Sequence, residues 1–366
     1  MKESHAILTG HGAPKPPRFL FLVPAHDEED HIEACTRSLL GQNYPSSACH
    51  VMVVADNCGD ATAALARSAG AEVAERVDPA RRGKPHAIAW ALERVDWTAF
   101  DAVVIVDADS LVDKGFAAGL AEEAPLRGKA VQAYFGSSNE FENWLTRLAG
   151  VLTRVRYELV YPNKQKAGLN VPLTGNGMCL GSDLLTRTGW QAFSLTEDLE
   201  LYAQWTAEGV KIRYARSAVL HSQEARSLRQ SGSQRTRWAT GRWQVLRRWA
   251  RPLLATTCIG WRQKLDVLLE LGLPSPVLQV VLSTIATAAA AMLAPAPANY
   301  PIALLAVLPA LTHIMRAALV VGQHPQPART LAACLMAPVY VVWRAGLALR
   351  HVFGPVESEW RRTRRN

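Results

Sequence analysis

A long, almost uncharged segment near the C-terminus most limits what this chain can fold into. Between Leu271 and Trp343 the only charged side chains are Arg316 and Arg329. A water-soluble fold needs many charged residues on its surface, so we expect this segment to contact a lipid bilayer. The mean hydropathy of the whole chain is close to zero because a polar N-terminal part offsets this segment.

The C-terminal part, residues 251–366, contains three apolar stretches that predict membrane helices. Residues 271–294 and 302–322 are each long enough to cross about 30 Å of hydrocarbon, and the short gap between them predicts a helical hairpin. Residues 331–353 contain a proline and two arginines, so this third helix is expected either to cross or to lie at the interface. The basic tail prefers the cytoplasm. We therefore expect a multi-pass protein of the inner (cell) membrane with its larger part cytoplasmic.

Residues 18–250, which follow a flexible leader at 1–17, show the alternating pattern of an α/β domain. Short apolar runs predict strands at Phe19–Val23, His50–Ala55, Ala71–Glu75 and Ala102–Val106. Helical patterns occupy residues 29–40, 61–69 and 84–93, and one long helix is predicted over 137–161. Continuous β-branched runs separated by helices favour a mostly parallel sheet that is covered on both faces.

Polar loops follow three of these strands. They read Pro24-Ala-His-Asp-Glu-Glu29, Asp56-Asn-Cys-Gly-Asp60 and Asp107-Ala-Asp109. Asp and Asn are common turn and N-cap residues, so each loop alone has a purely structural explanation. Ligands, however, bind beyond the carboxyl ends of parallel strands. Three acidic loops at one edge therefore favour a site that holds a cation and a polar ligand.

The ordered motifs resemble those of the family 2 glycosyltransferases, particularly the membrane-integrated cellulose, hyaluronan and poly-N-acetylglucosamine synthases. Besides the three loops, the matching elements are Arg82-Gly-Lys84, Thr196-Glu-Asp198 and Gln234-Arg-Thr-Arg-Trp238, and together they cover about residues 19–240. The resemblance implies an α/β fold of GT-A type with a mixed, mostly parallel sheet. It also implies a nucleotide-sugar donor, a divalent metal and inversion at the anomeric carbon.

The loops after the first two strands offer acceptors for a nucleoside. Asp27, Glu28 and Asp56 can accept hydrogen bonds from a uracil N–H and from ribose hydroxyls, which favours a UDP-sugar. The resembled motif adds Pro24 and His26 to the expected substrate contacts.

The loop after the fourth strand, together with a lysine, is expected to bind the diphosphate. Two exposed carboxylates suit a hard cation such as Mg²⁺ or Mn²⁺. By the resemblance, Asp109 is the main metal ligand, and Asp107 lies nearer the nucleotide and is a second ligand. Lys84 lies between a strand and a helix, where it can reach phosphate or the donor.

The later motifs are expected to serve catalysis and the acceptor. Displacement at an anomeric carbon needs a base for the acceptor hydroxyl, and Asp198 is the candidate, with Glu197 orienting it. The alternative is an acid pair that stabilises a helix N-terminus. Gln234 belongs to the substrate motif, Arg237 can bind diphosphate with its guanidinium fork, and Trp238 can stack on a sugar ring.

Residues 226–251 contain eight arginines and no acid, interleaved with tryptophans. Such a stretch suits an anionic lipid surface, and we expect it to be interfacial. It also allows a non-catalytic membrane-binding or nucleic-acid-binding protein, but the near-neutral balance of residues 1–270 argues against nucleic acid. A sugar nucleotidyltransferase is a further alternative, which would need neither the Thr196-Glu-Asp198 motif nor a membrane hairpin.

The sequence leaves the acceptor open. It is expected to be a saccharide or a lipid-linked oligosaccharide at the bilayer. Single transfer and processive synthesis, the latter with other exopolysaccharide-synthesis subunits, are both consistent with the motifs.

Overall fold

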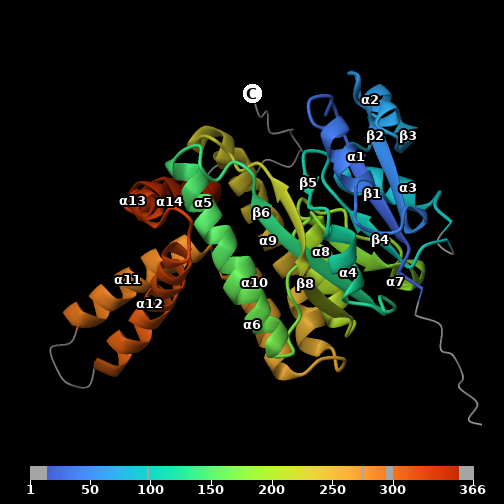
Figure 1. The fold of residues 1–366 in the computed structure, drawn as a ribbon. Helices are drawn as coiled ribbons and strands as arrows, with labels where there is room; N and C mark the ends of the chain where they lie inside the picture. The colour runs from blue at the N-terminus through green and yellow to red at the C-terminus, as the bar shows by residue number, and fades with distance from the viewer. Residues whose placement is uncertain (1–14, 97–98, 274, 294–299, 354–366) are drawn as a thin grey trace, which may run out of the picture.

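Eight strands form one mixed sheet in the order β3-β2-β1-β4-β7-β6-β8-β5 (Figure 1). The computed structural model describes residues 15–96, 99–273, 275–293 and 300–353. Most of the expected leader and the basic tail lie outside these ranges. The strands are β1 (Phe19–Ala25), β2 (Cys49–Asp56), β3 (Glu72–Arg76), β4 (Ala102–Ile105), β5 (Leu111–Val112), β6 (Lys129–Ser137), β7 (Met178–Gly181) and β8 (Lys211–Ser222).

Helices cover both faces of this sheet. Those up to β8 are α1 (Ile32–Leu40), η1 (Ser46–Ala48), α2 (Thr62–Ser68), α3 (Lys84–Leu92), α4 (Phe116–Ala121), α5 (Trp144–Arg154), η3 (Val155–Val160), α6 (Tyr161–Lys166), α7 (Ser182–Thr188) and α8 (Glu197–Ala207). Those after β8 are α9 (Leu228–Ala255), α10 (Trp261–Gly272), α11 (Pro276–Leu293), α12 (Tyr300–Gly322), α13 (Pro327–Cys334) and α14 (Ala337–Phe353).

Strand β1 lies at the centre of the core because it is apolar on both faces. Its side chains alternate, so Leu20 and Leu22 join the core beneath α3, α7 and α8, whereas Phe19 and Phe21 join the core beneath α1, α2 and α4. All four are fully buried. The strand pairs β1–β2, β1–β4, β2–β3 and β6–β8 are parallel and the others antiparallel, so the predicted mixed, mostly parallel α/β sheet is confirmed.

The strand order reverses at β1, and this reversal positions the site. β1 pairs in parallel with β2 on one side and with β4 on the other. β7 then runs antiparallel between β4 and β6. The loops after β1, β2 and β4 consequently leave the same edge of the sheet, where a crevice forms at such a reversal.

The predicted single helix over residues 137–161 is wrong in its extent. Ser137 ends strand β6, and the helix begins at Trp144 after a capping box in which Asn143 accepts hydrogen bonds from two backbone N–H groups. It then continues as one turn of π-helix, η3, and as α6 up to Lys166. Apolar periodicity alone does not reveal the cap that fixes this start.

The first and third predicted membrane stretches are each shorter and interrupted. Helix α10 ends at Gly272 and α11 begins at Pro276, so residues 271–294 do not form one continuous helix. The stretch 331–353 is likewise divided between α13 and α14. Proline at the first position of a helix favours a start there and not continuation from a preceding helix.

Within the described residues, one helix, Pro301–Gly322, is long and apolar enough to cross a membrane. Two bent pairs, residues 261–272 with 276–292 and 327–334 with 337–347, meet the same criteria when each pair is taken together. Figure 1 shows α11 and α12 side by side, projecting away from the sheet. The structure thus supports one apolar span by length and composition and does not establish a multi-pass arrangement.

A glycine contact between α4 and β8 provides a test of this packing. A Cβ atom at Gly119 would lie 2.4 Å from the backbone nitrogen of Ala218, and backbone cannot move aside as a flexible side chain can. We predict that Gly119→Ala lowers the free energy of unfolding by about 1–3 kcal/mol, although alanine favours helix over glycine by up to ~1 kcal/mol. Chemical denaturation of the purified protein measures this change.

The control is Gly115→Ala at the start of the same helix, where no atom lies within 4 Å of the added Cβ. It should change stability by less than ~1 kcal/mol. An unfolding free energy for Gly119→Ala that equals or exceeds that of the unchanged protein would contradict the packing described here.

Candidate active site

The loops that follow β1 and β2 are tied together by hydrogen bonds. The Gly59 N–H donates to Asp27 Oδ1 at 2.7 Å, and the Asp27 N–H lies 3.5 Å from Cys58 Sγ. His26 Nδ1 lies 2.7 Å from the Asp56 carbonyl oxygen. Asp27 and Asn57 both adopt positive φ, 52° and 53°, which Asp and Asn tolerate better than other side chains. The residue types at these two positions therefore suit the backbone conformation of the turns.

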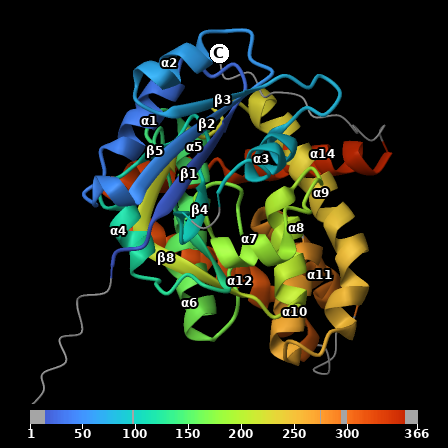
Figure 2. The ribbon, with the colours of Figure 1, turned by 90° about the vertical axis from the view of Figure 1, so that its right-hand side faces the viewer.

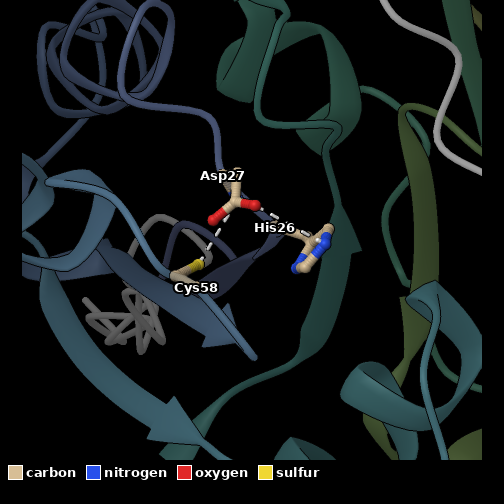
Figure 3. A group of neighbouring side chains, drawn as sticks. All are labelled: His26, Asp27 and Cys58. Carbon is tan, nitrogen blue, oxygen red and sulfur yellow. Dashed lines mark hydrogen bonds and ion pairs between the residues drawn. The ribbon is translucent and has the colours of Figure 1, made fainter. Parts of the chain in front are cut away.

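His26, Asp27 and Cys58 form a compact group at this point (Figure 3). One ligand atom from each lies within 4.8 Å of the others, a spacing that could hold a metal ion. However, burial raises the pKa of the Cys58 thiol, which disfavours the thiolate that metals bind, and this thiol lies 3.5 Å from the Ala25 carbonyl oxygen. With Asp27 Oδ1 also occupied by a backbone N–H, these side chains act as a brace between two loops.

Two more predicted substrate residues lie in the same region. Pro24 is the next-to-last residue of β1 and pairs with Val54 of β2. Glu28 follows the brace, and its N–H donates to Thr62 Oγ1 at 2.8 Å, while its carbonyl accepts the first backbone bonds of α1. Both positions help to shape the loop between β1 and α1.

Asp56 is held by an arginine that the sequence analysis did not select. Its Oδ1 lies 2.5 Å from Nη1 of Arg76, the last residue of β3, and both side chains are almost fully buried. Arg76 also pairs with Asp78 at 3.0 Å and donates to the Arg81 carbonyl at 2.8 Å. The sequence signal that could have revealed Arg76 is its position as a charged residue at the end of a short edge strand. This pairing fixes the orientation of the Asp56 carboxylate at the end of β2.

Lys84 joins several of the predicted motifs. Its Nζ lies 2.6 Å from Asp107 Oδ1, 2.5 Å from the Gly175 carbonyl oxygen and 3.6 Å from Glu197 Oε1. Burial acts to lower the pKa of Lys84, but Asp107 and Glu197 outweigh it, so the pKa is raised and the ammonium stays charged. The predicted phosphate-binding lysine thus lies among three motifs, paired with a carboxylate.

The Asp107-Ala-Asp109 loop is fixed from behind by Asn176. The Asp107 N–H donates to Asn176 Oδ1 at 3.1 Å, and Asn176 Nδ2 donates to Ser110 Oγ at 2.8 Å. Asp109 Oδ1 accepts from Ser222 Oγ, at the end of β8, at 3.2 Å. These bonds hold the two carboxylates at the carboxyl end of β4.

These carboxylates fit a divalent cation of the Mg²⁺ type. In the described part of the chain, no third His, Cys, Asp or Glu joins Asp107 and Asp109 in a group as compact as that of His26, Asp27 and Cys58. Mg²⁺ is commonly held by only one or two carboxylates, with substrate phosphates and water as further ligands. The donor set therefore suits an ion that binds together with a diphosphate.

Asp198 lies against a glycine of the segment that follows α6. A Cβ at Gly175 would lie 3.4 Å from Asp198 Oδ2 and 3.6 Å from Lys84 Nζ, and Gly175 has φ +80°, so glycine both fits the space and adopts the backbone conformation. Burial and then the neighbouring Glu197 raise the pKa of Asp198 to about 7. A half-buried carboxyl with this pKa can take up a proton near neutral pH.

Thr196 occupies the predicted N-cap position of α8, but its side chain makes no capping bond. Its hydroxyl is instead buried and without a hydrogen-bond partner in the described chain, because α9 packs directly on it. A Cβ at Gly241 would come within 2.6 Å of this side chain. The close approach places α9 beside the start of α8, and Figure 2 shows α8, α9 and α10 next to one another.

The Gln234–Trp238 motif lies on α9, one turn before Gly241. Arg237 and Gly241 are four residues apart and so share a helix face. The Nε atom of Arg237 is buried and finds no hydrogen-bond partner among the described residues, which suits a site that receives an anion. Gln234 is half-buried, and Trp238 is 40% exposed with the Arg235 guanidinium 5.0 Å from its ring centre.

The basic stretch of α9 does not face outward as a whole. Trp243 is half exposed, with Arg247 stacked on its ring, as an interfacial surface requires. Arg248, however, pairs with the buried Glu200 of α8 at 2.6 Å, and Arg242 donates to the Glu270 carbonyl of α10. The expectation that all these arginines lie on lipid is therefore wrong for Arg242, since helix packing directs it onto α10, whereas the side chain of Arg248 is 64% exposed although it pairs with Glu200.

Comparison with known proteins gives a consistent result. A family model described as glycosyltransferase like family 2 matches residues 16–241. A probable glycosyltransferase of Bacillus subtilis (strain 168), YdaM, is 25% identical over 243 residues, which cover 63% of this chain and 56% of that protein. This chain thus matches little more than half the length of that relative.

The chain is also similar to solved structures. The mannosyltransferase PcManGT of Pyrobaculum calidifontis, solved with GDP-Man and Mn²⁺, aligns with a TM-score of 0.53 and 18% identity over 92% of this chain and 88% of that one. TarS 1–349 of S. aureus, solved with UDP-GlcNAc, aligns with a TM-score of 0.48 and 15% identity over 90% and 92% of the two chains.

The family model covers more than half of the chain, and its range contains every motif described above. The edge loops, the Asp107-Ala-Asp109 pair, Asp198 and the first half of α9 all fall within it. The chain therefore belongs to the family 2 glycosyltransferases.

Proposed function

We propose that this protein is an inverting, metal-dependent glycosyltransferase that moves a sugar from a nucleotide-sugar donor to a saccharide or lipid-linked acceptor at a membrane. The observation that carries the proposal is the junction at Lys84, which contacts Asp107 and lies beside Asp198 through Gly175. Expected donor and acceptor motifs, more than a hundred residues apart in sequence, are brought together there. PcManGT, solved with a nucleotide sugar and Mn²⁺, has a related fold.

The donor nucleoside is proposed to lie over the loops after β1 and β2. Asp56, oriented by Arg76, offers a carboxylate there, and Asp27 and Glu28 flank it. The diphosphate then extends toward Asp107, Asp109 and Lys84. A divalent cation held by Asp109 and Asp107 would neutralise the diphosphate as it leaves. Arg237, with its unpartnered buried Nε, is proposed as a further diphosphate contact.

In the proposed reaction the acceptor hydroxyl oxygen forms a bond to the anomeric carbon of the donor. Asp198 accepts the hydroxyl proton while the bond from the anomeric carbon to the diphosphate oxygen breaks, and its electron pair leaves with the nucleoside diphosphate. One carboxylate acting as base in a direct displacement inverts the anomeric configuration. Burial, and then charge repulsion from Glu197, keep the pKa of Asp198 high, so that Asp198 is a competent base near neutral pH.

The C-terminal helices are proposed to hold this site at the cytoplasmic surface of the cell membrane. Large apolar side chains of α12 are exposed in the structure, among them Leu304, Leu305, Leu311 and Ile314. Exposed apolar surface of this size is unfavourable in water, and its transfer into hydrocarbon lowers the free energy. The exposed Trp243 and Arg247 of α9 suit the headgroup region of the same membrane.

The first test concerns the base. We predict that Asp198→Asn lowers sugar transfer by at least ~100-fold while nucleotide binding is kept, because only the proton acceptor is removed. Nucleotide release from a panel of UDP- and GDP-sugars, measured with membranes and Mn²⁺, gives the rate. Glu208→Gln at the other end of α8 is the matched carboxylate control and should leave the rate unchanged. Full transfer by Asp198→Asn would rule out this role.

The second test concerns pH. A base must be ionised to accept a proton. The kcat/KM for the acceptor, measured with the unchanged protein, should therefore rise tenfold per pH unit below about pH 7 and reach a plateau above it. Because Glu197 raises the pKa of Asp198, Glu197→Gln should move this inflection to lower pH. A pH profile from 5 to 9 measures both. An inflection that stays at the same pH in Glu197→Gln would contradict the coupling.

The third test concerns the metal. We predict that Mn²⁺ tightens binding of UDP or GDP to the unchanged protein and that this effect is lost in Asp109→Asn, since a carboxylate ligand is removed. Titration calorimetry with and without Mn²⁺ measures the difference. Asp113→Asn, an exposed carboxylate four residues further on, is the control and should keep the Mn²⁺ effect. Equal Mn²⁺ enhancement in Asp109→Asn would exclude Asp109 as a ligand.

The fourth test concerns the membrane. Leu311 lies midway along α12 and is 50% exposed. An arginine at the centre of a spanning helix costs about 2.5–3.5 kcal/mol on insertion. Leu311→Arg should therefore increase the fraction of protein that alkaline carbonate extracts from membranes, whereas Leu40→Arg, at the exposed end of α1, should not. Unchanged extraction of Leu311→Arg would show that α12 is not the membrane anchor.

A further inference from the structure

Two arginines near Asp198 have no role in the donor site described above. Arg156 lies on the π-helical turn η3, and Arg242 lies on α9. Both side chains are half-buried. In the described part of the chain, neither guanidinium has a carboxylate within 4.0 Å, and the hydrogen bond of Arg242 goes to a main-chain carbonyl.

Four contacts place the segments that carry these arginines around one point. Tyr157, next to Arg156, has its hydroxyl 2.8 Å from Thr174 Oγ1, and the following Gly175 lies against Asp198. Gly241, next to Arg242, lies against Thr196, two residues before Asp198. Two of these contacts thus fix η3, and a third fixes α9, relative to the proposed base. A π-helical turn is uncommon in helices and is frequently found at functional sites.

The fourth contact is made by α10. Arg242 donates to the carbonyl of Glu270, while the Glu270 carboxylate is taken by Lys164 at 3.1 Å. Lys164 also holds Asp266 at 3.0 Å, so this lysine and the two carboxylates compensate one another. The positive charges of Arg156 and Arg242 are left without a partner in direct contact.

The charges in this region act on one another through space. Burial alone would raise the pKa of Glu270, but Lys164, Arg156 and Arg242 outweigh it and lower the pKa. Burial likewise lowers the pKa of Arg242; the charge of Glu270 opposes this effect, and the nearby Arg156 adds to it. The carboxylate of Glu270 thus acts on both guanidinium groups, but only through space, and an anion in direct contact with both would compensate their repulsion further.

We infer that Arg156 and Arg242 form an oxyanion-binding subsite on the acceptor side of Asp198, and that the acceptor carries a phosphate ester near its attacking hydroxyl. The inference rests on the proposed function, because Asp198 defines the acceptor side. Paired guanidinium forks present many N–H donors in the geometry that phosphate oxygens accept. Within the described chain, Glu270 and Asp198 act on the Arg156 guanidinium through space and not by direct hydrogen bonds, so its N–H donors are available to such a ligand.

Binding of inorganic phosphate to the full chain tests this subsite directly. The detergent-purified protein is first saturated with UDP, or GDP, and Mn²⁺ so that the proposed diphosphate site is filled, and phosphate is then titrated by calorimetry. We expect saturable binding that weakens at least ~10-fold in Arg156→Gln and in Arg242→Gln. Arg156→Lys keeps the charge but loses the fork and should be intermediate. Arg187→Gln, an exposed arginine of α7, is the matched control and should bind phosphate normally.

Three results would overturn the inference. These are no saturable phosphate binding by the unchanged protein, undiminished binding by Arg156→Gln with an unchanged melting temperature, and weakened UDP binding by the same variant. The last result would place Arg156 in the donor site. If Arg156→Gln melts at a lower temperature, Arg156→Lys decides the matter by the same titration.

Acceptor assays identify the source of the phosphate. A polyprenyl-phosphate-linked sugar in vesicles, a soluble sugar phosphate and an uncharged methyl glycoside are compared as acceptors. Transfer to one phosphate-bearing acceptor, lost in Arg156→Gln, supports the inference and names the class. Equal transfer to the methyl glycoside by both proteins would refute it. Phosphate binding without any donor turnover would reject the proposed function and leave the subsite standing, so the two failures are distinguishable.

Discussion

The ammonium group of Lys84 is the contact on which the arrangement of the site depends. It binds Asp107 at the end of β4 and the Gly175 carbonyl in the segment after α6, and it lies close to Glu197 at the start of α8. Removing a half-buried cation from between carboxylates leaves repelling charges, so this lysine determines how closely the segments approach. The raised pKa of Asp198 follows from this crowding, since burial and Glu197 outweigh the opposing charge of Lys84.

A second buried polar cluster joins the C-terminal helices to the catalytic domain. His324, after α12, is fully buried, and its Nε2 lies 3.0 Å from Glu140 Oε1. Its Nδ1 accepts the Gln326 N–H, so Nε2 carries the hydrogen and donates it to Glu140. Glu140 in turn lies so close to Gly150 of α5 that a Cβ there would meet its carboxyl group at 2.6 Å. These contacts fix the direction in which α12 leaves the domain.

The three polar loops could be located from the sequence because each follows a short apolar strand, and the end of such a strand can be recognised from nearby residues. Sequence reasoning did not find Arg76 or Arg156, since a lone arginine is most often a solvated surface residue and only its partners distinguish it. It also assigned Arg242 to a lipid surface, because regular spacing on a helix shows which residues share a face but not what that face meets. The start of α5 was misplaced because a capping box, not apolar periodicity, fixes it.

The sequence by itself determined the alternating strands and helices, the three polar loops at one sheet edge and the apolar character of the C-terminal third. These features follow from the order of apolar and polar side chains over short stretches, which sets local backbone structure. Only the tertiary structure decided that Lys84, Gly175 and Asp198 meet, that Arg156 and Arg242 lie near this junction, and that the apolar third forms bent pairs beside one continuous helix. Those outcomes depend on contacts between residues about twenty to nearly two hundred positions apart, and such contacts are selected by the packing of the whole chain.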